Sequence, residues 1–261
     1  MRDLLDRELG AARPVLMYHG VGASAAHGEA GYTVSPAALA AHLAALARHA
    51  VRVCSLPELL AGAPGACLTF DDGEASVATE AAPLLAARGW VGVAYVTSGF
   101  VAMPGYLTRA QVRELHAHGW TIGAHGRTHR LLTDLAGGEL EDELRAARAD
   151  LEDLLGARVE HLSLPGGRGD RRVLAAAARA GYASIATSRP GLNRRVRPQA
   201  LARLVVRAGD APERVLRLAR GDGPTVAQAI ITVGALDAAK WLLGNRRYGA
   251  ARALWRRLLD Y

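Results

Sequence analysis

The residues with the clearest chemical potential are two adjacent carboxylates, Asp71 and Asp72, which follow an apolar run at 66–70 and precede Gly73. Like charges this close in a partly buried site repel each other and raise a pKa. The repulsion is relieved if one carboxylate binds a metal ion while the other stays free as a base. A turn that caps the next helix would use the same Asp-Asp-Gly sequence, so the motif alone leaves both interpretations open.

Two histidines, His125 and His129, stand four residues apart at the end of a second apolar run, 120–125. If the chain turns helical between them, both imidazoles can face one centre. With a carboxylate they would form a three-ligand site that leaves positions open for water and substrate, as catalytic zinc sites require. Histidine pairs also occur in caps and surface loops, so the hypothesis depends on where the two motifs lie in the fold.

Two further segments close predicted strands. Gly166, in the Leu-Pro-Gly-Gly sequence at 164–167, lies in a turn whose backbone could approach a ligand and whose N–H groups could bind an oxyanion. His19, in a strand predicted over 14–21, could be the general acid that protonates a departing amine. Each also has an ordinary structural explanation, as a turn and as a strand-end histidine.

Apolar runs alternate with helical periodicity over most of the chain. Helix starts are indicated by Ser35-Pro36 and Thr108, and helix ends by Gly89 and Gly119. The alternation predicts an α/β fold: a distorted (β/α)7-type barrel of mostly parallel strands. The active residues of such folds lie at the C-terminal ends of the strands, where all four segments above fall. The predicted strands are 14–21, 51–55, 66–70, 90–97, 120–125, 159–164 and 182–187.

The sequence predicts two domains: a catalytic barrel over 1–210, and a helical C-terminal extension over 211–261, where the strands stop alternating with helices. Residues 225–243 are apolar with few charges, and five arginines follow between 246 and 257. A helix packed on the barrel would explain them. Alternatively, 225–261 binds an anionic membrane surface, with apolar side chains in the lipid boundary and arginines at the headgroups.

Composition narrows the class of partner. The net charge of +7 suits an anionic partner, but no recognition helix or aromatic ladder accompanies the basic residues, so nucleic acid is not expected. Charges interleave with leucines in the first 13 residues, unlike a secretory signal, and no apolar run reaches about 18 residues. We therefore expect a cytoplasmic protein, peripheral to the inner leaflet of the membrane if its tail binds lipid.

In combination, Leu-Thr-Phe-Asp-Asp-Gly at 68–73 and His-x-x-x-His at 125–129 resemble the polysaccharide deacetylase family, carbohydrate esterases that remove N-acetyl groups from chitin, peptidoglycan and poly-N-acetylglucosamine. The resemblance extends over about 14–207. It implies that Asp71 is the base and that Asp72, His125 and His129 bind Zn²⁺ or another divalent transition metal. It also implies that the Gly166 N–H stabilises the oxyanion, and, in the circularly permuted poly-N-acetylglucosamine branch, that His19 is the acid.

The sequence departs from the family pattern at two places in the third motif. Ser163 stands where the family has the arginine that orients the base, so Arg203 is a candidate substitute. Gly166 stands where the family has an aromatic residue that walls the sugar subsite. The predicted function is a metal-dependent deacetylase acting on an N-acetylated polysaccharide, oligosaccharide or lipid-linked sugar. An amidase for a non-sugar C–N bond and a non-catalytic glycan-binding module are the alternatives.

Overall fold

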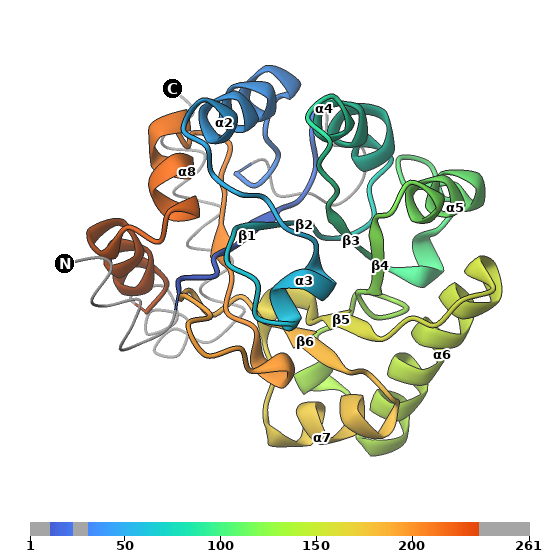
Figure 1. The fold of residues 1–261 in the computed structure, drawn as a ribbon. Helices are drawn as coiled ribbons and strands as arrows, with labels where there is room; N and C mark the ends of the chain where they lie inside the picture. The colour runs from blue at the N-terminus through green and yellow to red at the C-terminus, as the bar shows by residue number, and fades with distance from the viewer. Residues whose placement is uncertain (1–10, 23–30, 235–261) are drawn as a thin grey trace, which may run out of the picture.

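A ring of helices surrounds seven parallel strands in the structure, a computed structural model that describes residues 11–22 and 31–234 (Figure 1). The sheet order is β6-β5-β4-β3-β2-β1-β7. This arrangement confirms the predicted distorted (β/α)7-type barrel. The strands are β1 (Val15–Tyr18), β2 (Cys67–Phe70), β3 (Val93–Val96), β4 (Thr121–Ala124), β5 (His161–Ser163), β6 (Ser184–Ala186) and β7 (Leu204–Val205).

The two ends of the sheet meet at Leu201, just before β7. Leu201 pairs with Ala186 of β6 in a single parallel bridge. Its N–H donates to the Ile185 carbonyl at 2.8 Å, and its carbonyl accepts the Thr187 N–H at 3.0 Å. The barrel therefore closes through a seam one residue wide, which places the residues on either side of Leu201 next to β6.

One predicted strand is wrong. Residues 51–55 pair with the chain only at Val53, which forms one parallel bridge with Ala66. The run stops there because the side chain of Ser55 caps a helix, α3 (Leu56–Leu60), in a reciprocal capping box with Glu58. The seventh strand is β7 instead, whose two residues are too short to show a strand pattern in the sequence.

The outer helices follow the predicted order, and Ser35 and Thr108 cap α2 and α5 as expected. The helix that ends before Gly89 begins only after Glu74, because Glu74 pairs with Tyr106 in an antiparallel bridge. The structure describes the apolar segment 225–243 only to residue 234, and the arginines between 246 and 257 lie outside the described residues. The helices are α2 (Pro36–Arg48), α4 (Ala82–Ala86, after the π-helical turn Val77–Ala81), α5 (Arg109–Ala117), α6 (Gly137–Leu155), α7 (Arg171–Arg179) and α8 (Pro212–Ala219).

Alternation along the strands divides the buried side chains into two layers. Outward residues such as Leu16, Leu68 and Ile122 pack beneath the helices in the main core. Inward residues form a second cluster with Leu56 and Leu59 of α3. This helix lies across the end of the barrel at which the strands begin (Figure 1). The inward cluster contains Val15, Cys67, Val93, Tyr95, Ala186 and Leu201.

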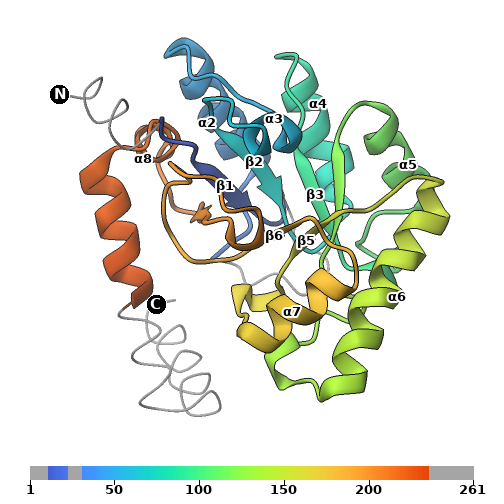
Figure 2. The ribbon, with the colours of Figure 1, turned by 60° about the horizontal axis from the view of Figure 1, so that its bottom comes forward.

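Further along the same inward positions the side chains become polar. Thr69 follows Cys67 on β2, Asp71 comes directly after the end of that strand, and Ser163 ends β5, all of them buried. The barrel interior therefore has an apolar floor and a polar upper layer at the C-terminal ends of the strands. Figure 2 shows the barrel from the side, with α6 and α7 on one flank and α8 on the other.

Gly123 of β4 generates a prediction about the interior packing. A Cβ at this position would lie 2.5 Å from Cδ1 of Tyr95 and 2.9 Å from the His161 carbonyl oxygen. We expect Gly123→Ala to lower the free energy of unfolding by about 1–3 kcal/mol, because the backbone of the neighbouring strand cannot move aside without losing packing contacts. Denaturant titration measures the change.

Gly137→Ala is the matched control, because a Cβ there meets nothing within 4 Å and the residue opens α6. The control should match the parent or gain slightly, since alanine favours helix. A Gly123→Ala variant as stable as the parent would contradict the packing described for Tyr95.

Candidate metal centre and active site

Three predicted ligands converge at the C-terminal ends of β2 and β4. The ligand atoms of Asp72, His125 and His129 all lie within 4.8 Å of one another. Oδ1 of Asp72 is 3.3 Å from Nε2 of His125 and 3.1 Å from Nε2 of His129. One carboxylate oxygen and two imidazole nitrogens are the donors of a three-ligand zinc site with open positions. The chemistry of this donor set fits a divalent transition metal ion.

A backbone carbonyl on the neighbouring strand fixes the orientation of the His125 ring. This buried ring donates Nδ1–H to the Ser163 carbonyl at 2.9 Å, so in the neutral ring the Nε2 lone pair faces Asp72. Such a backbone acceptor is the usual device that sets the tautomer of a metal-binding histidine. Burial lowers the pKa of His125, but the nearby Asp71 and Asp72 outweigh it and raise the pKa above its ordinary value.

The backbone at both motifs is bent more sharply than the sequence suggests. Asp72 and His129 adopt φ of +75° and +61°, in the left-handed region that costs a non-glycine residue free energy. The two histidines face each other without a helical turn between them: the chain bends at 127–128 after Gly126, whose φ is +73°. The strained φ of His129 brings its ring back toward His125, with 5.1 Å between the ring centroids.

The carboxylate of Asp71 is held by a guanidinium from the segment just before β7. Arg203, which is 1% exposed, donates from Nη1 to Oδ1 and from Nη2 to Oδ2 of Asp71, both at 2.7 Å. Ser163 Oγ bridges the pair, accepting from Nη2 of Arg203 at 2.8 Å and donating to Oδ2 of Asp71 at 3.1 Å. Arg203 and Ser163 therefore meet at the carboxylate, which is the geometry expected of a substitute for the missing arginine.

The remaining guanidinium donors are also satisfied. Nε of Arg203 donates to the Thr187 carbonyl at 2.9 Å, and Nη1 reaches Oγ1 of Thr69 at 3.3 Å. Arginine has five N–H donors, so each one has an acceptor here. Complete pairing is what permits a charge to lie in a barrel interior, where an unpaired one is strongly destabilising.

The two adjacent carboxylates are both stabilised as anions, each by a different partner. Burial raises the pKa of Asp71, but Arg203 and His125 outweigh it and hold the pKa below its ordinary value. Burial also raises the pKa of Asp72, while hydrogen bonds with His125 and His129 bring it well below that value. The repulsion between the two charges is thus offset mainly by Arg203 at Asp71 and by the two imidazoles at Asp72.

His19 lies at the same end of the barrel, beside the ring of Tyr32 at 5.1 Å between centroids. Its Nδ1 is buried and forms no hydrogen bond with the described residues. Burial lowers the pKa of His19, and the charges of Asp72 and Asp71 oppose that shift. The ring is therefore within electrostatic reach of both carboxylates.

Gly166 forms part of a tight turn, 165–167, with a φ of +63°. A Cβ there would lie 2.6 Å from Cδ2 of Leu131, two residues after His129. Leu131 therefore occupies the space beside residue 166. A side chain at position 166 would require Leu131 to move, so an aliphatic side chain lies here beside the turn.

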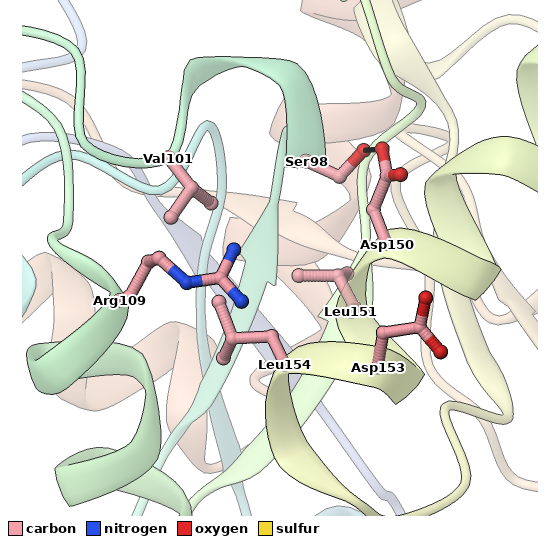
Figure 3. A pocket seen from close by; sticks show the side chains of 7 residues that line it. All are labelled: Ser98, Val101, Arg109, Asp150, Leu151, Asp153 and Leu154. Carbon is pink, nitrogen blue, oxygen red and sulfur yellow. Dashed lines mark hydrogen bonds between the residues drawn. The ribbon is translucent and has the colours of Figure 1, made fainter.

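Two features of this region were not identified from the sequence. Glu143 of α6 is buried and accepts hydrogen bonds from the loop between the histidines. The sequence signal that could have identified Glu143 is an acidic residue between two core positions of the helix, Leu140 and Leu144. The second is a hollow outside the barrel between Ser98, Arg109 and the α6 residues Asp150 and Asp153 (Figure 3). No predicted site residue lines this hollow.

Comparison with known families gives a match in the middle of the chain. The family model described as polysaccharide deacetylase matches residues 61–185. Bacillus subtilis YxkH, a protein named as a polysaccharide deacetylase, is 27% identical over 124 residues. That alignment covers 48% of this chain and 44% of YxkH, so the chain spans less than half of that relative.

Solved structures with the same fold extend the similarity over most of the chain. Streptococcus pyogenes deacetylase PplD, solved in complex with acetate, superposes with a TM-score of 0.72 at 21% identity, covering 80% of this chain and 98% of PplD. IcaB from Ammonifex degensii superposes with a TM-score of 0.72 at 24% identity, covering 81% of this chain and 98% of IcaB. At these identities the similarity establishes the fold.

The buried ion pair generates a stability prediction. Arg203→Met leaves the Asp71 carboxylate buried without its cation, which should cost about 3–5 kcal/mol. The double variant Asp71→Asn/Arg203→Met should recover much of that loss, giving a large coupling free energy in a double-mutant cycle. Because the folded-state pKa of Asp71 is depressed, the stability from the pair is present above about pH 4 and is lost as the pH falls through the folded value.

Denaturant titrations of the four proteins at several pH values measure both effects. The double variant should lack this part of the acid dependence, which serves as the control. Additive single effects, or an Arg203→Met variant within about 0.5 kcal/mol of the parent, which is the ordinary range for a surface change, would show that the pair does not stabilise the barrel.

Proposed function

Because the chain belongs to the polysaccharide deacetylase family, we propose that it is a metal-dependent hydrolase that removes N-acetyl groups from an amino-sugar glycan and releases acetate. One observation carries the proposal. The Asp72, His125 and His129 cluster lies beside Asp71, a buried carboxylate ionised by its own cation. A ligand set for a Lewis acid and a separate base are the two parts that metal-assisted amide hydrolysis needs.

Zn²⁺ is the proposed ion, since two imidazoles and a carboxylate suit it better than the hard cations that prefer all-oxygen sites. When bound, the ion would supply Lewis acidity, polarising the acetyl carbonyl and lowering the pKa of water. Asp72, His125 and His129 would hold it. Asp71 lies outside that ligand set, because its carboxylate is turned toward Arg203 and only the ligand atoms of the other three residues converge.

Asp71 is the proposed base, and its contacts indicate which oxygen acts. Oδ2 accepts two hydrogen bonds, from Arg203 and Ser163, whereas Oδ1 accepts one from Arg203 among the described residues. A carboxylate oxygen has two lone-pair sites, so Oδ1 keeps acceptor capacity for the proton of an attacking water. Arg203 and Ser163 would fix the direction in which that lone pair points.

His19 and Gly166 complete the proposal. The buried Nδ1 of His19 has no partner among the described residues, so a proton could pass through this ring to the departing amine. The exposed turn at Gly166 leaves its backbone accessible to the acetyl oxygen. Leu131, packed against Gly166, would supply the apolar wall of the acetyl subsite.

The first test joins metal and activity. His125→Ala removes a buried nitrogen donor, so the variant should lose both bound Zn²⁺ and acetate release from an N-acetylated oligosaccharide. Metal analysis by mass spectrometry and an enzymatic acetate assay measure the two quantities. Undiminished metal content in the variant would rule out this ligand set. A parent that binds Zn²⁺ but releases no acetate from polymeric, oligomeric or lipid-linked N-acetyl sugars would favour the non-sugar amidase.

The second test separates the base and the acid from the ligands. Asp71→Asn should keep its metal and lose turnover by about 10²–10⁴-fold, the range for a general base. His19→Ala should also keep its metal and lose turnover. Steady-state kinetics at matched metal occupancy give the comparison. A fully active His19→Ala variant would show that the proton reaches the amine by another route.

A membrane role is proposed for the C-terminal segment, supported by its sequence and by one exposed helix. Residues 223–234 are helical, with Val226 buried and Ile231 71% exposed. The arginines between 246 and 257 lie outside the described residues. Within the part of the chain that the structure describes, no helix is both long enough and apolar enough to span a bilayer. We infer that 225–261 binds an anionic lipid surface from one side.

Co-sedimentation with phosphatidylserine-containing vesicles tests this role. The full chain should pellet with these vesicles, less so at high salt, because headgroup attraction to arginine is screened. The chain lacking 235–261 and neutral vesicles are the controls. Absence of binding by the full chain at low salt would overturn the membrane role. The cytoplasmic location stays a prediction.

A further inference from the structure

The loop that carries His129 needs an external constraint. His129 has a φ of +61°, and Gly126 two residues after the strand has a φ of +73°. A left-handed non-glycine residue persists only when its surroundings fix it. Without such a constraint the loop would sample other conformations, and His129 would then point away from Asp72.

Glu143 of α6 supplies that constraint. Its Oε1 accepts the N–H groups of Arg127 at 2.8 Å and Thr128 at 2.6 Å, the two residues between Gly126 and His129. The Thr128 hydroxyl donates to the same carboxylate at 3.0 Å. Two successive backbone N–H groups converging on one anion form the nest that a bent backbone offers to a negative group. The buried carboxylate thus specifies the bend immediately before the second histidine.

A second contact from α6 provides a contrast. Asp150, seven residues after Glu143, lies 3.2 Å from Nε of Arg127 and accepts from Ser98 Oγ at 2.8 Å, beside the external hollow (Figure 3). The Arg127 and Asp150 side chains are 52% and 38% exposed. Exposed ion pairs contribute little, and this one binds the side chain of Arg127 rather than the backbone. The carbonyls of Gly126 and Arg127 accept the N–H groups of Ser98 and Gly99 at 3.1 and 2.9 Å, so Glu143 is the α6 contact that holds the N–H groups of the loop.

We propose that Glu143 is a positioning residue that preforms the bend at His129 and so sets the affinity of Asp72, His125 and His129 for a divalent ion. This inference rests on the proposed metal role of those three residues. Groups that orient metal ligands typically change affinity by about 10–100-fold when they are lost. The effect should appear in metal affinity even where the fold is unaffected.

Zn²⁺ titration of the metal-free chain against a competing chelator tests the proposal. Glu143→Asp keeps the charge but shortens the side chain by one methylene, so its oxygens cannot reach both N–H groups. We expect its Kd for Zn²⁺ to rise by about 10–100-fold. Glu143→Gln keeps an oxygen at the same reach that can accept both N–H groups, so its Kd should rise less. Asp150→Asn, on the same helix, should bind Zn²⁺ as tightly as the parent.

Thermal unfolding of each metal-free variant establishes that it is folded before titration. A folded Glu143→Asp variant with the parent's Kd would overturn the inference, even if its melting temperature fell. A rise in Kd as large for Asp150→Asn as for Glu143→Asp would also overturn it, because the effect would then not depend on the backbone contacts. A parent that binds no Zn²⁺ would instead overturn the proposed metal site, so the two failures are distinguishable.

Discussion

The ion pair between Arg203 and Asp71 is the interaction on which the upper half of the barrel depends. It joins β2 to the segment just before β7, and its other hydrogen bonds reach β5 through Ser163 and the end of β6 through Thr187. A buried pair of this kind is tolerated only when its partners are complete, and removing one of them is strongly destabilising. The same contacts that tie the closing seam together therefore hold the proposed base in one orientation.

Different partners give the adjacent carboxylates different roles. Asp71 points into the barrel toward Arg203, while the left-handed backbone of Asp72 turns its side chain toward the two histidines. Charges that would otherwise compete are each neutralised locally, one by a guanidinium and one by imidazoles and the ion they would bind. The left-handed backbone at His129 needs surrounding contacts to hold it, among them the hydrogen bonds from the preceding Arg127 and Thr128 N–H groups to Glu143.

Sequence reasoning succeeded where the signal was local. The alternation of strands and helices, the caps at Ser35 and Thr108, and the placement of both motifs at strand ends all follow from neighbouring residues. It failed at 51–55, because an apolar run with a helix cap directly after it has no length left for a strand. The two histidines were considered to converge if the chain turned helical between them, but they converge through left-handed φ at Gly126 and His129 instead, which no local pattern indicates.

Other features depend on contacts between distant segments. Arg203 lies 132 residues from Asp71, and only the missing arginine at Ser163 suggested that the two meet. Neither the one-residue seam at Leu201 nor the contact between Leu131 and Gly166 has a sequence pattern, because each arises from how the closed barrel brings loops together. Glu143 was not identified for the same reason, since the N–H groups that donate to it lie in a loop distant in the sequence.

We propose that one carboxylate binds the metal while its neighbour, held by Arg203, remains free to act as a base. A crystal structure of the Zn²⁺-loaded chain, with anomalous scattering recorded at the zinc edge, would distinguish the two carboxylates. We expect a single ion bonded to Asp72, His125 and His129, with the Asp71 carboxylate still paired to Arg203 and Ser163. An ion bonded to Asp71, or one bound away from the two histidines, would contradict it.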